Sequence, residues 1–382
     1  LTVSLQEEGV IACVKHFALN SMEDLRFYVD VHIDDRALHE VYLPHFKKCV
    51  DAGAQSIMGA YNRYEEYHCC ENKKLLTDIL RREWGFDGFV MSDFVWGVYD
   101  AEHSLRAGLD LEMMFTMKYS EGNIRKCLKK GLLNEEHIDR AVDNILRALL
   151  RMEPKIRKRP MSVVRSKEHR ALALEAAEKG MVLLENNGVL PLAKGASVIV
   201  CGPYADVANT GDHGSSRVYD PEVVTPYQGL REVFAKTTLA GPSNTANPKK
   251  DPKPVENSAA IRAEGDVAVV CVGFDYKGEG EYFVNTNYAL TEKPKDGGGD
   301  RLRLRLSREE VDLIKGLKKA GKKVVAVLFS GCAILVDEWK EYADAIVMNY
   351  YAGCEGGRAL ANLLFGAKNF SGHLPFTVAK KE

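Results

Sequence analysis

Short apolar runs alternate with helical patterns over the first 150 residues of the chain. Three runs are continuous rather than alternating, as in strands buried on both faces of a parallel sheet, at 10–14, 55–60 and 89–91. A fourth run lies at 108–114, and apolar residues recur at helical spacing at 36–50, 73–82 and 134–149. Four successive strand–helix units predict a parallel sheet with right-handed crossovers.

The pattern breaks at residues 153–168, which are basic, contain proline and show no periodicity. These features favour a linker. A second α/β pattern follows, with helices expected at 171–182 and 308–319 and strands at 197–201, 266–273, 323–329 and 345–348. We therefore predict an α/β protein with domains at 1–152 and 169–382.

Two long polar segments, 241–258 and 282–300, interrupt the second pattern. The latter contains three consecutive glycines at 297–299, so we expect it to be a mobile loop or part of a binding rim rather than core. In the first domain, four strand–helix units are half of what an eight-stranded barrel needs. An open sheet of four strands would leave both edges unpaired.

Charge and hydropathy exclude several classes of partner. The formal net charge of −2 gives no electrostatic reason to expect binding to nucleic acid or to an anionic membrane. No apolar run approaches the roughly 20 residues that span a bilayer, so we expect a soluble globular protein. The first residues include neither a methionine nor a signal peptide, which leaves a cytoplasmic and a secreted or periplasmic location both open.

The nine cysteines are scattered and form no Cys-x-x-Cys pair, so their spacing favours neither a disulfide framework nor a zinc site. Cys13, Cys201 and Cys271 lie in apolar runs and are predicted to be core residues. The glycines that follow strands form neither a dinucleotide fingerprint nor a Walker pattern, and no His-x-x-x-His pair suggests a catalytic metal. We therefore predict no cofactor.

Polar residues stand at the ends of three consecutive strands. Lys15 and His16 end the first, Tyr61 with its neighbours Asn62 and Arg63 ends the second, and Asp93 follows the third. The carboxyl ends of parallel strands form one edge where ligands bind, and a sugar needs such a hydrogen-bonding lining. The alternative is that Asp93 caps a helix and that the Lys and His are ordinary surface residues.

A carboxylate at that edge could attack an anomeric carbon. Two-step glycoside hydrolysis needs a second carboxyl group about 5 Å away to protonate the leaving oxygen. Glu279 and Glu281 follow the strand expected at 266–273, and glycines on both sides would let Glu279 adopt a tight turn. The alternative here is a solvated turn.

With these residues identified, the chain closely resembles the family-three glycoside hydrolases of the β-glucosidase type. The motifs that carry the resemblance lie at 15–20, 34–44, 56–62, 75–93, 181–192, 211–217, 355–357 and 371–377. The resemblance implies a barrel followed by a six-stranded α/β sandwich, with the active site between them. It places Asp93 on the nucleophile and Glu279 on the acid/base, with Glu281 as the second choice.

The resemblance also implies that Lys15, His16, Tyr61, Phe94 and Ser215 bind substrate. Phe94 stands where the family commonly has tryptophan. Residues 18–20, which follow the Lys-His-Phe segment, exclude the variant with a histidine acid/base. That segment comes after roughly half of the family's barrel strands, so we expect a fragment, the C-terminal half of a (β/α)8 TIM barrel followed by an α/β sandwich domain.

The function predicted for the intact protein is retaining hydrolysis that releases terminal non-reducing β-D-glucosyl residues. The expected substrate is a small oligosaccharide or an aryl or alkyl β-glycoside, and a homo-oligomer is left open. The alternatives are a β-xylosidase or related exo-β-glycosidase, or a non-catalytic sugar-binding fragment.

Overall fold

The structure is a computed structural model that describes residues 1–220, 222–244, 255–281 and 298–382. The chain divides into two compact units, Leu1–Arg159 and Pro160–Glu382, and each is described by itself. The division falls within the predicted linker 153–168, where the short 3₁₀ turns Glu153–Lys155 and Met161–Val163 lie. Among the described helices, none combines the length and the apolar composition needed to cross a membrane.

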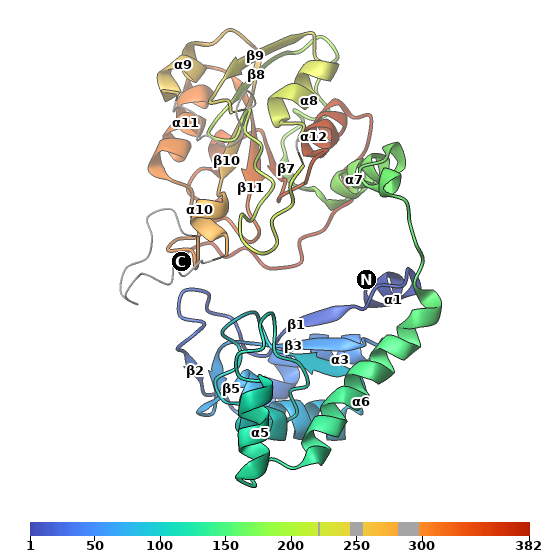
Figure 1. Cartoon of the computed structure of the whole chain (residues 1–382). Coiled ribbons are helices and arrows are strands. Elements are labelled where there is room, and N and C mark those ends of the chain that lie inside the picture. Colours follow the sequence, from blue (N-terminus) through green and yellow to red (C-terminus); the bar gives the residue numbers. More distant parts are fainter. Residues whose placement is uncertain (221, 245–254, 282–297) are drawn as a thin grey trace. The chain divides into compact units, whose positions relative to one another are not determined.

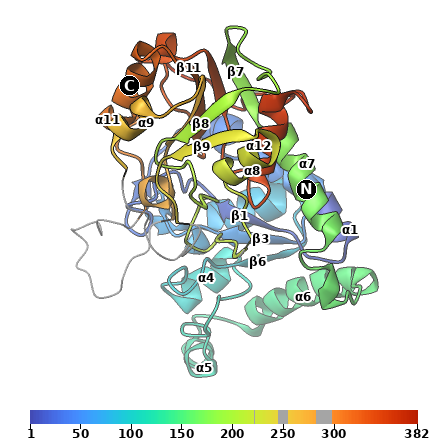
Figure 2. The same ribbon diagram turned by 90° about the horizontal axis from the view of Figure 1, so that it is seen from above.

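Unit 1 is built around a three-stranded parallel sheet in the order β1 (Cys13–Phe17), β3 (Ser56–Gly59), β6 (Phe89–Met91) (Figure 2). The three predicted runs thus pair side by side, and all four residues of β3 are buried. A second small sheet joins β2 (Asp30–Val31), β4 (Arg63–Tyr64) and β5 (Tyr67–His68). The described residues form no closed barrel.

The fourth expected strand, at 108–114, does not form. This segment makes a single parallel bridge, between Met91 and Leu111. The physical reason is that its polar side chains are used as buried acceptors. Asp110 Oδ2 accepts from the Val90 amide (2.8 Å) and Arg81 Nη2 (2.5 Å), which takes the place of further strand pairing. Burial raises the pKa of Asp110, and the Arg81 guanidinium acts against that rise.

The helices of unit 1 follow the predicted pattern with one break. They are α1 (Thr2–Glu7), α2 (Asp35–Ala37) leading into a π-helical turn (Leu38–Tyr42), α3 (Pro44–Asp51), a π-helical segment (Lys74–Glu83), α4 (Ala101–Ala107), α5 (Glu121–Lys129) and α6 (Glu135–Met152). The helix expected at 36–50 is divided because Pro44 has no amide hydrogen and begins a new helix. Side chains from these helices and from the sheet share one core, which includes Phe17, Leu38, Ile57, Leu76 and Val90.

Unit 2 contains a six-stranded sheet in the order β7-β12-β11-β10-β8-β9. The strands are β7 (Val182–Asn186), β8 (Ser197–Cys201), β9 (Lys236–Ala240), β10 (Val267–Gly273), β11 (Lys323–Phe329) and β12 (Ala345–Met348). β7 is antiparallel to β12, and the other neighbours are parallel.

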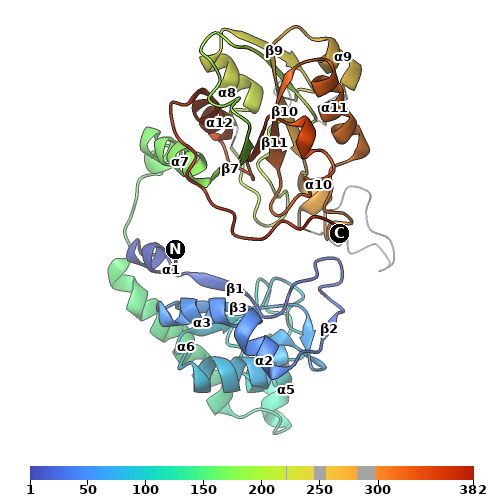
Figure 3. The same ribbon diagram turned by 180° about the vertical axis from the view of Figure 1, so that it is seen from behind.

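Helices cover both faces of this sheet (Figures 1 and 3). On one face pack α7 (Lys167–Gly180), α8 (Pro226–Val233) and α12 (Gly356–Phe365), and on the other α9 (Asn257–Arg262) and α11 (Arg308–Lys319). Alternate residues of β10 enter the two cores, Val269 on the first side and Val270 on the second. Both faces are therefore apolar, which explains the continuous apolar run in the sequence.

The strand order of unit 2 marks a place where ligands bind in such sheets. From β8 the chain moves outward to β9, and from β10 it moves in the opposite direction through β11 to β12. Loops that leave the carboxyl ends of β8 and β10 therefore diverge, and the crevice beside such a switch point is the usual ligand site of an open α/β sheet.

The cysteines are all free. Cys201 and Cys271 are fully buried, as predicted, whereas Cys13 is only partly buried. Most of the two long polar segments lies outside the described residues. Contrary to the expectation for 297–299, the described Gly298 and Gly299 are buried, and the Gly299 amide donates to Gly280 O (2.7 Å).

Candidate active site

Asp93 follows β6 and faces the histidine near the end of β1. His16 Nε2 lies 3.5 Å from Asp93 Oδ2, and the Phe94 amide donates to Asp93 Oδ1 (2.8 Å). The Asp93 side chain is 10% exposed, and its Oδ2 accepts no hydrogen bond from the described residues. A buried carboxylate oxygen without a hydrogen bond requires an explanation, and a reacting group is one.

The turn after Asp93 is tightly built. Ser92 Oγ donates to Asp93 O (2.8 Å) and accepts from the Met113 amide (2.9 Å). Val95 has φ +66, a strained value for a β-branched residue, and its amide donates to Met113 O (2.8 Å). Strain of this kind persists where surrounding contacts enforce it and is concentrated at functional sites.

Gly97 lies against the backbone of Asp93, and we expect Gly97→Ala to reduce activity at least about tenfold. An added Cβ would stand 2.6 Å from Asp93 O and 2.9 Å from Asp93 N, so the backbone at Asp93 or at position 97 must shift, and small misplacements of reacting groups are costly. The measurement is kcat/KM with circular dichroism as a check of folding. Gly122→Ala on α5, where the added Cβ meets no atom within 4 Å, is the matched control. Equal activity in both variants would contradict this prediction.

The other predicted residues of unit 1 lie near the same edge in different settings. Lys15 is exposed on β1, and both Lys15 and Asp93 act electrostatically on the Cys13 thiol, whose pKa is raised chiefly by burial. Tyr61 is buried and its hydroxyl donates to Phe94 O (2.6 Å). The Phe94 ring is exposed. Tyr61 therefore contacts the backbone of the residue after Asp93, whereas Lys15 and Asp93 share only their electrostatic effect on Cys13.

Two strand-end residues have structural roles that the sequence did not reveal. Asn62 is fully buried and its Nδ2 donates to Ala18 O (3.2 Å). Arg63 donates from Nε to His68 Nε2 (3.3 Å). Both tie neighbouring loops together, so the polar lining is smaller than the sequence predicts.

A group of aromatic and charged side chains beside Tyr61 was missed by sequence reasoning. Arg26 is 8% exposed. Its guanidinium lies 5.1 Å from the centre of the Phe27 ring and 5.3 Å from the centre of the Tyr61 ring. Phe27 in turn contacts Trp96 edge-on at 5.9 Å. Residues 20–29 show neither strand nor helix periodicity. The only feature of the sequence that could have pointed to this group is the adjacent pair Arg26 and Phe27.

The predicted glutamates lie on the loop that leaves β10. Asp275 caps the short helix α10 (Tyr276–Glu279), accepting from the Lys277 amide (3.0 Å), and burial raises the pKa of Asp275. The glycines beside Glu279 do not have the positive φ expected of a tight turn. They are required by close packing instead, because a Cβ on Gly280 would stand 2.5 Å from Tyr276 O.

The Glu279 carboxylate is surrounded by groups from other strand ends. Its Oε1 accepts from the Tyr351 hydroxyl and the Gly331 amide (2.5 Å). Its Oε2 accepts from Ser330 Oγ (3.1 Å) and lies 3.5 Å from Arg301 Nε. Ser330 and Gly331 follow β11 and Tyr351 follows β12, so the switch-point edge assembles this pocket of donors.

Ser215, predicted to bind substrate, contacts Glu281, the second choice for the acid/base. The Ser215 amide, rather than its side chain, donates to Glu281 Oε2 (2.5 Å), and the Glu281 amide donates to Asp212 Oδ1 (2.8 Å). Burial acts to raise the pKa of Asp212, but the hydrogen bonds from Glu281 and Ser216 outweigh it and lower that pKa. The segment 211–217 thus holds the glutamate loop through backbone contacts.

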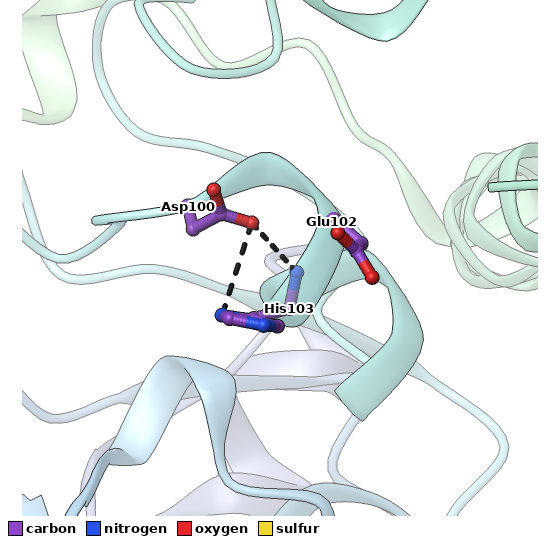
Figure 4. A group of neighbouring side chains, drawn as sticks. All are labelled: Asp100, Glu102 and His103. Atoms are coloured by element: carbon purple, nitrogen blue, oxygen red, sulfur yellow. Dashed lines mark hydrogen bonds and ion pairs between the residues drawn. The ribbon is translucent and has the colours of Figure 1, made fainter. Parts of the chain in front are cut away.

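One surface group among the described residues has atoms close enough together for a metal ion, Asp100, Glu102 and His103 (Figure 4). Asp100 is the N-cap of α4, and its Oδ1 accepts from the His103 amide (2.9 Å). Asp100 and His103 are exposed and Glu102 is partly so. Helix capping accounts for this arrangement, so we assign no metal to it.

Comparison with known families matches both units. Residues 2–148 match the family described as Glycosyl hydrolase family 3 N terminal domain. Residues 181–382 match the Glycosyl hydrolase family 3 C-terminal domain.

Curated relatives and solved structures agree with that match. A beta-glucosidase of Bacteroides ovatus is 32% identical over 99% of this chain and 53% of its own length. An exo-alpha-(1->6)-L-arabinopyranosidase of Bifidobacterium longum is 32% identical over 97% of this chain and 48% of its own. The structure of beta-glucosidase 3B from Thermotoga neapolitana in complex with glucose has a TM-score of 0.80 at 29% identity, covering all of this chain and 55% of that one. The chain thus spans about half the length of the curated relatives it matches.

Proposed function

Because the chain belongs to glycosyl hydrolase family 3, we propose that the whole protein is a retaining glycosidase that releases terminal non-reducing β-D-glucosyl residues. The proposal takes residues 1–152 as the C-terminal half of a (β/α)8 barrel, 153–168 as a linker and 169–382 as an α/β sandwich domain. The observation that carries it is the Asp93 carboxylate, whose buried Oδ2 accepts no hydrogen bond from the described residues at the strand-end edge of unit 1.

In the first step, Asp93 Oδ2 attacks the anomeric carbon as the bond from that carbon to the leaving oxygen breaks. The carboxylic acid of Glu279 gives its proton to the leaving oxygen, so the aglycone departs as a neutral alcohol. The sugar is then an ester of Asp93 and Glu279 is a carboxylate. The reaction requires the two carboxyl groups about 5 Å apart around the bound sugar.

In the second step, Glu279 takes a proton from water while the water oxygen bonds to the anomeric carbon. The bond between that carbon and Asp93 breaks, which frees the sugar with its original configuration and restores both carboxyl groups. No redox change or cofactor enters this balance.

The remaining predicted residues receive positioning roles in this proposal. His16, 3.5 Å from Asp93 Oδ2, and the exposed Lys15 are donors for the hydroxyls of the sugar. Tyr61 fixes the backbone of Phe94 through its hydroxyl, and the exposed Phe94 ring offers an apolar surface to the sugar or its leaving group. Ser215 supports the glutamate loop through its amide.

Glucose is the proposed glycone because relatives and structural neighbours are named beta-glucosidases, one of them bound to glucose. The arabinopyranosidase of Bifidobacterium longum favours a second candidate, an exo-glycosidase that removes arabinopyranose. Initial rates of the whole protein on aryl glycosides of glucose, xylose and arabinopyranose decide between these glycones.

Covalent trapping tests the mechanism. A glucoside with a good leaving group, in which fluorine replaces the hydroxyl next to the anomeric carbon, forms the ester but hydrolyses slowly because fluorine destabilises the electron-poor transition states. We expect mass spectrometry of a digest to find the fluoroglucosyl group on the peptide that contains Asp93. Turnover without a labelled peptide, or a label on another carboxylate, would overturn the assignment.

A further inference from the structure

Every group that touches the Glu279 carboxylate in the described structure is a hydrogen-bond donor. The Gly331 amide and the Arg301 guanidinium have hydrogens to give and no lone pair to offer. The Ser330 and Tyr351 hydroxyls could in principle do either. Their own surroundings decide which they do.

The Ser330 hydroxyl donates its hydrogen to Glu279. Ser330 Oγ already accepts from Arg301 Nη1 (3.2 Å) and from the Cys332 amide (3.1 Å). A hydroxyl oxygen has two lone pairs, so the remaining contact, to Glu279 Oε2 at 3.1 Å, uses its hydrogen. Arg301 is itself fixed over the Phe274 ring, 4.6 Å from its centre, and its side chain is 6% exposed.

Tyr351 likewise keeps its proton and directs it at Glu279 Oε1. Burial and the nearby Glu279 charge raise the pKa of Tyr351, so the phenol does not ionise at working pH. Its position depends on an unusual backbone, because Tyr350 has φ +54, and Asn349 Nδ2 donates to Tyr350 O (3.1 Å). A left-handed aromatic residue is strained, and here it brings the next side chain to the glutamate.

We propose that Tyr351 is a positioning residue for Glu279, and that its hydroxyl, together with Ser330, Gly331 and Arg301, holds the Glu279 carboxylate in place after β10. The inference rests on the proposed function, in which Glu279 is the acid/base.

The proposal predicts a pH effect with a definite sign. Loss of a donor disfavours the carboxylate, so the glutamate binds its proton more tightly and the alkaline limb of kcat/KM moves to higher pH. Among the described residues, the charged and titratable groups that interact with Glu279 are Tyr204, Arg301 and Tyr351, and Asp275 acts electrostatically on both tyrosines.

The test uses Tyr351→Phe in the whole protein, with Tyr350→Phe as the matched control. The Tyr350 hydroxyl is buried and has no hydrogen-bond partner among the described residues, so its removal should not act on Glu279. For an alkyl glucoside, we expect the alkaline limb of Tyr351→Phe to move up by about one pH unit, and that of Tyr350→Phe to stay. A dinitrophenyl glucoside, whose leaving group needs no proton, should give equal kcat/KM in both variants.

An unmoved alkaline limb in Tyr351→Phe would overturn the proposal, as would an equal loss on both substrates, which is the mark of a merely structural role. If Tyr351→Phe does not fold, Ser330→Ala removes the other hydroxyl donor and carries the same expectation. Failure of the proposed function is recognised separately, because Glu279→Gln would then hydrolyse the alkyl glucoside at the wild-type rate.

Discussion

Asparagine in place of Asp93 is expected to lower kcat/KM of the whole protein for an aryl β-glucoside by roughly four orders of magnitude or more. The amide has no anionic oxygen to form the glycosyl ester. The fold should survive, because the asparagine oxygen still accepts from the Phe94 amide, now at 2.8 Å, and the new NH₂ group replaces an oxygen that accepts no hydrogen bond in the described structure. Steady-state kinetics and thermal unfolding measure the two effects.

Asp100→Asn provides the control for this prediction. Asp100 is an exposed aspartate a few residues further along the chain, and asparagine caps a helix about as well as aspartate does. Both its activity and its melting temperature should therefore match the wild type. Wild-type turnover by Asp93→Asn, in a preparation whose mass confirms the amide, would eliminate Asp93 as the nucleophile.

The sheet of unit 2 could be predicted from the sequence where its strands are buried on both faces. β8, β10, β11 and β12 send alternate residues into two separate cores, which leaves a continuous apolar run in the sequence. β9 was missed because it is an edge strand with a polar, half-exposed composition. β7 was missed because the helix before it ends at Gly180, and the apolar residues of the two elements read as one helical pattern.

In unit 1 the sequence predicted which residues share an edge but not which of them interact. β1 and β6 both run parallel to β3, so their carboxyl ends lie at the same edge of the sheet, where His16 Nε2 is 3.5 Å from Asp93 Oδ2. The role of Asn62 could not be read in this way, because a polar residue at a strand end looks the same whether it lines a site or supports a loop. The prediction of a fourth strand at 108–114 was wrong for a related reason. The Asp110 carboxylate accepts a hydrogen bond from the Val90 amide, a contact that the sequence pattern does not reveal.

The hydrogen-bond partners of Glu279 could not be predicted from sequence patterns. Its partners stand after two other strands, and Tyr351 is 72 residues away along the chain. Without the strand order nothing connects these segments, whereas the order places the ends of β10, β11 and β12 next to one another. The resemblance supplied the choice of Glu279, and the structure adds the donors on which its chemistry depends.

Glu279→Gln is expected to reduce kcat/KM for an alkyl glucoside by roughly 10²- to 10⁴-fold, the usual contribution of general acid–base catalysis. The amide cannot deliver a proton to a poor leaving group. With a dinitrophenyl glucoside the first step needs no acid, so its kcat/KM should stay close to the wild type while kcat falls, because activation of water in the second step also needs the carboxylate. Measuring both substrates therefore separates loss of the acid/base from general damage.

Glu281→Gln is the matched variant, two residues away on the same loop. Its amide oxygen can still accept from Ser215 N, now 2.5 Å from Glu281 Oε2, so the loop should keep its shape and the alkyl glucoside should be hydrolysed at nearly the wild-type rate.

Azide distinguishes the two glutamates in a separate experiment, because this anion attacks the glycosyl ester without help from a base. We expect azide to raise the kcat of Glu279→Ala on the dinitrophenyl glucoside and to release a β-glucosyl azide, with no such effect on Glu281→Ala. The reverse pattern would transfer the acid/base role to Glu281.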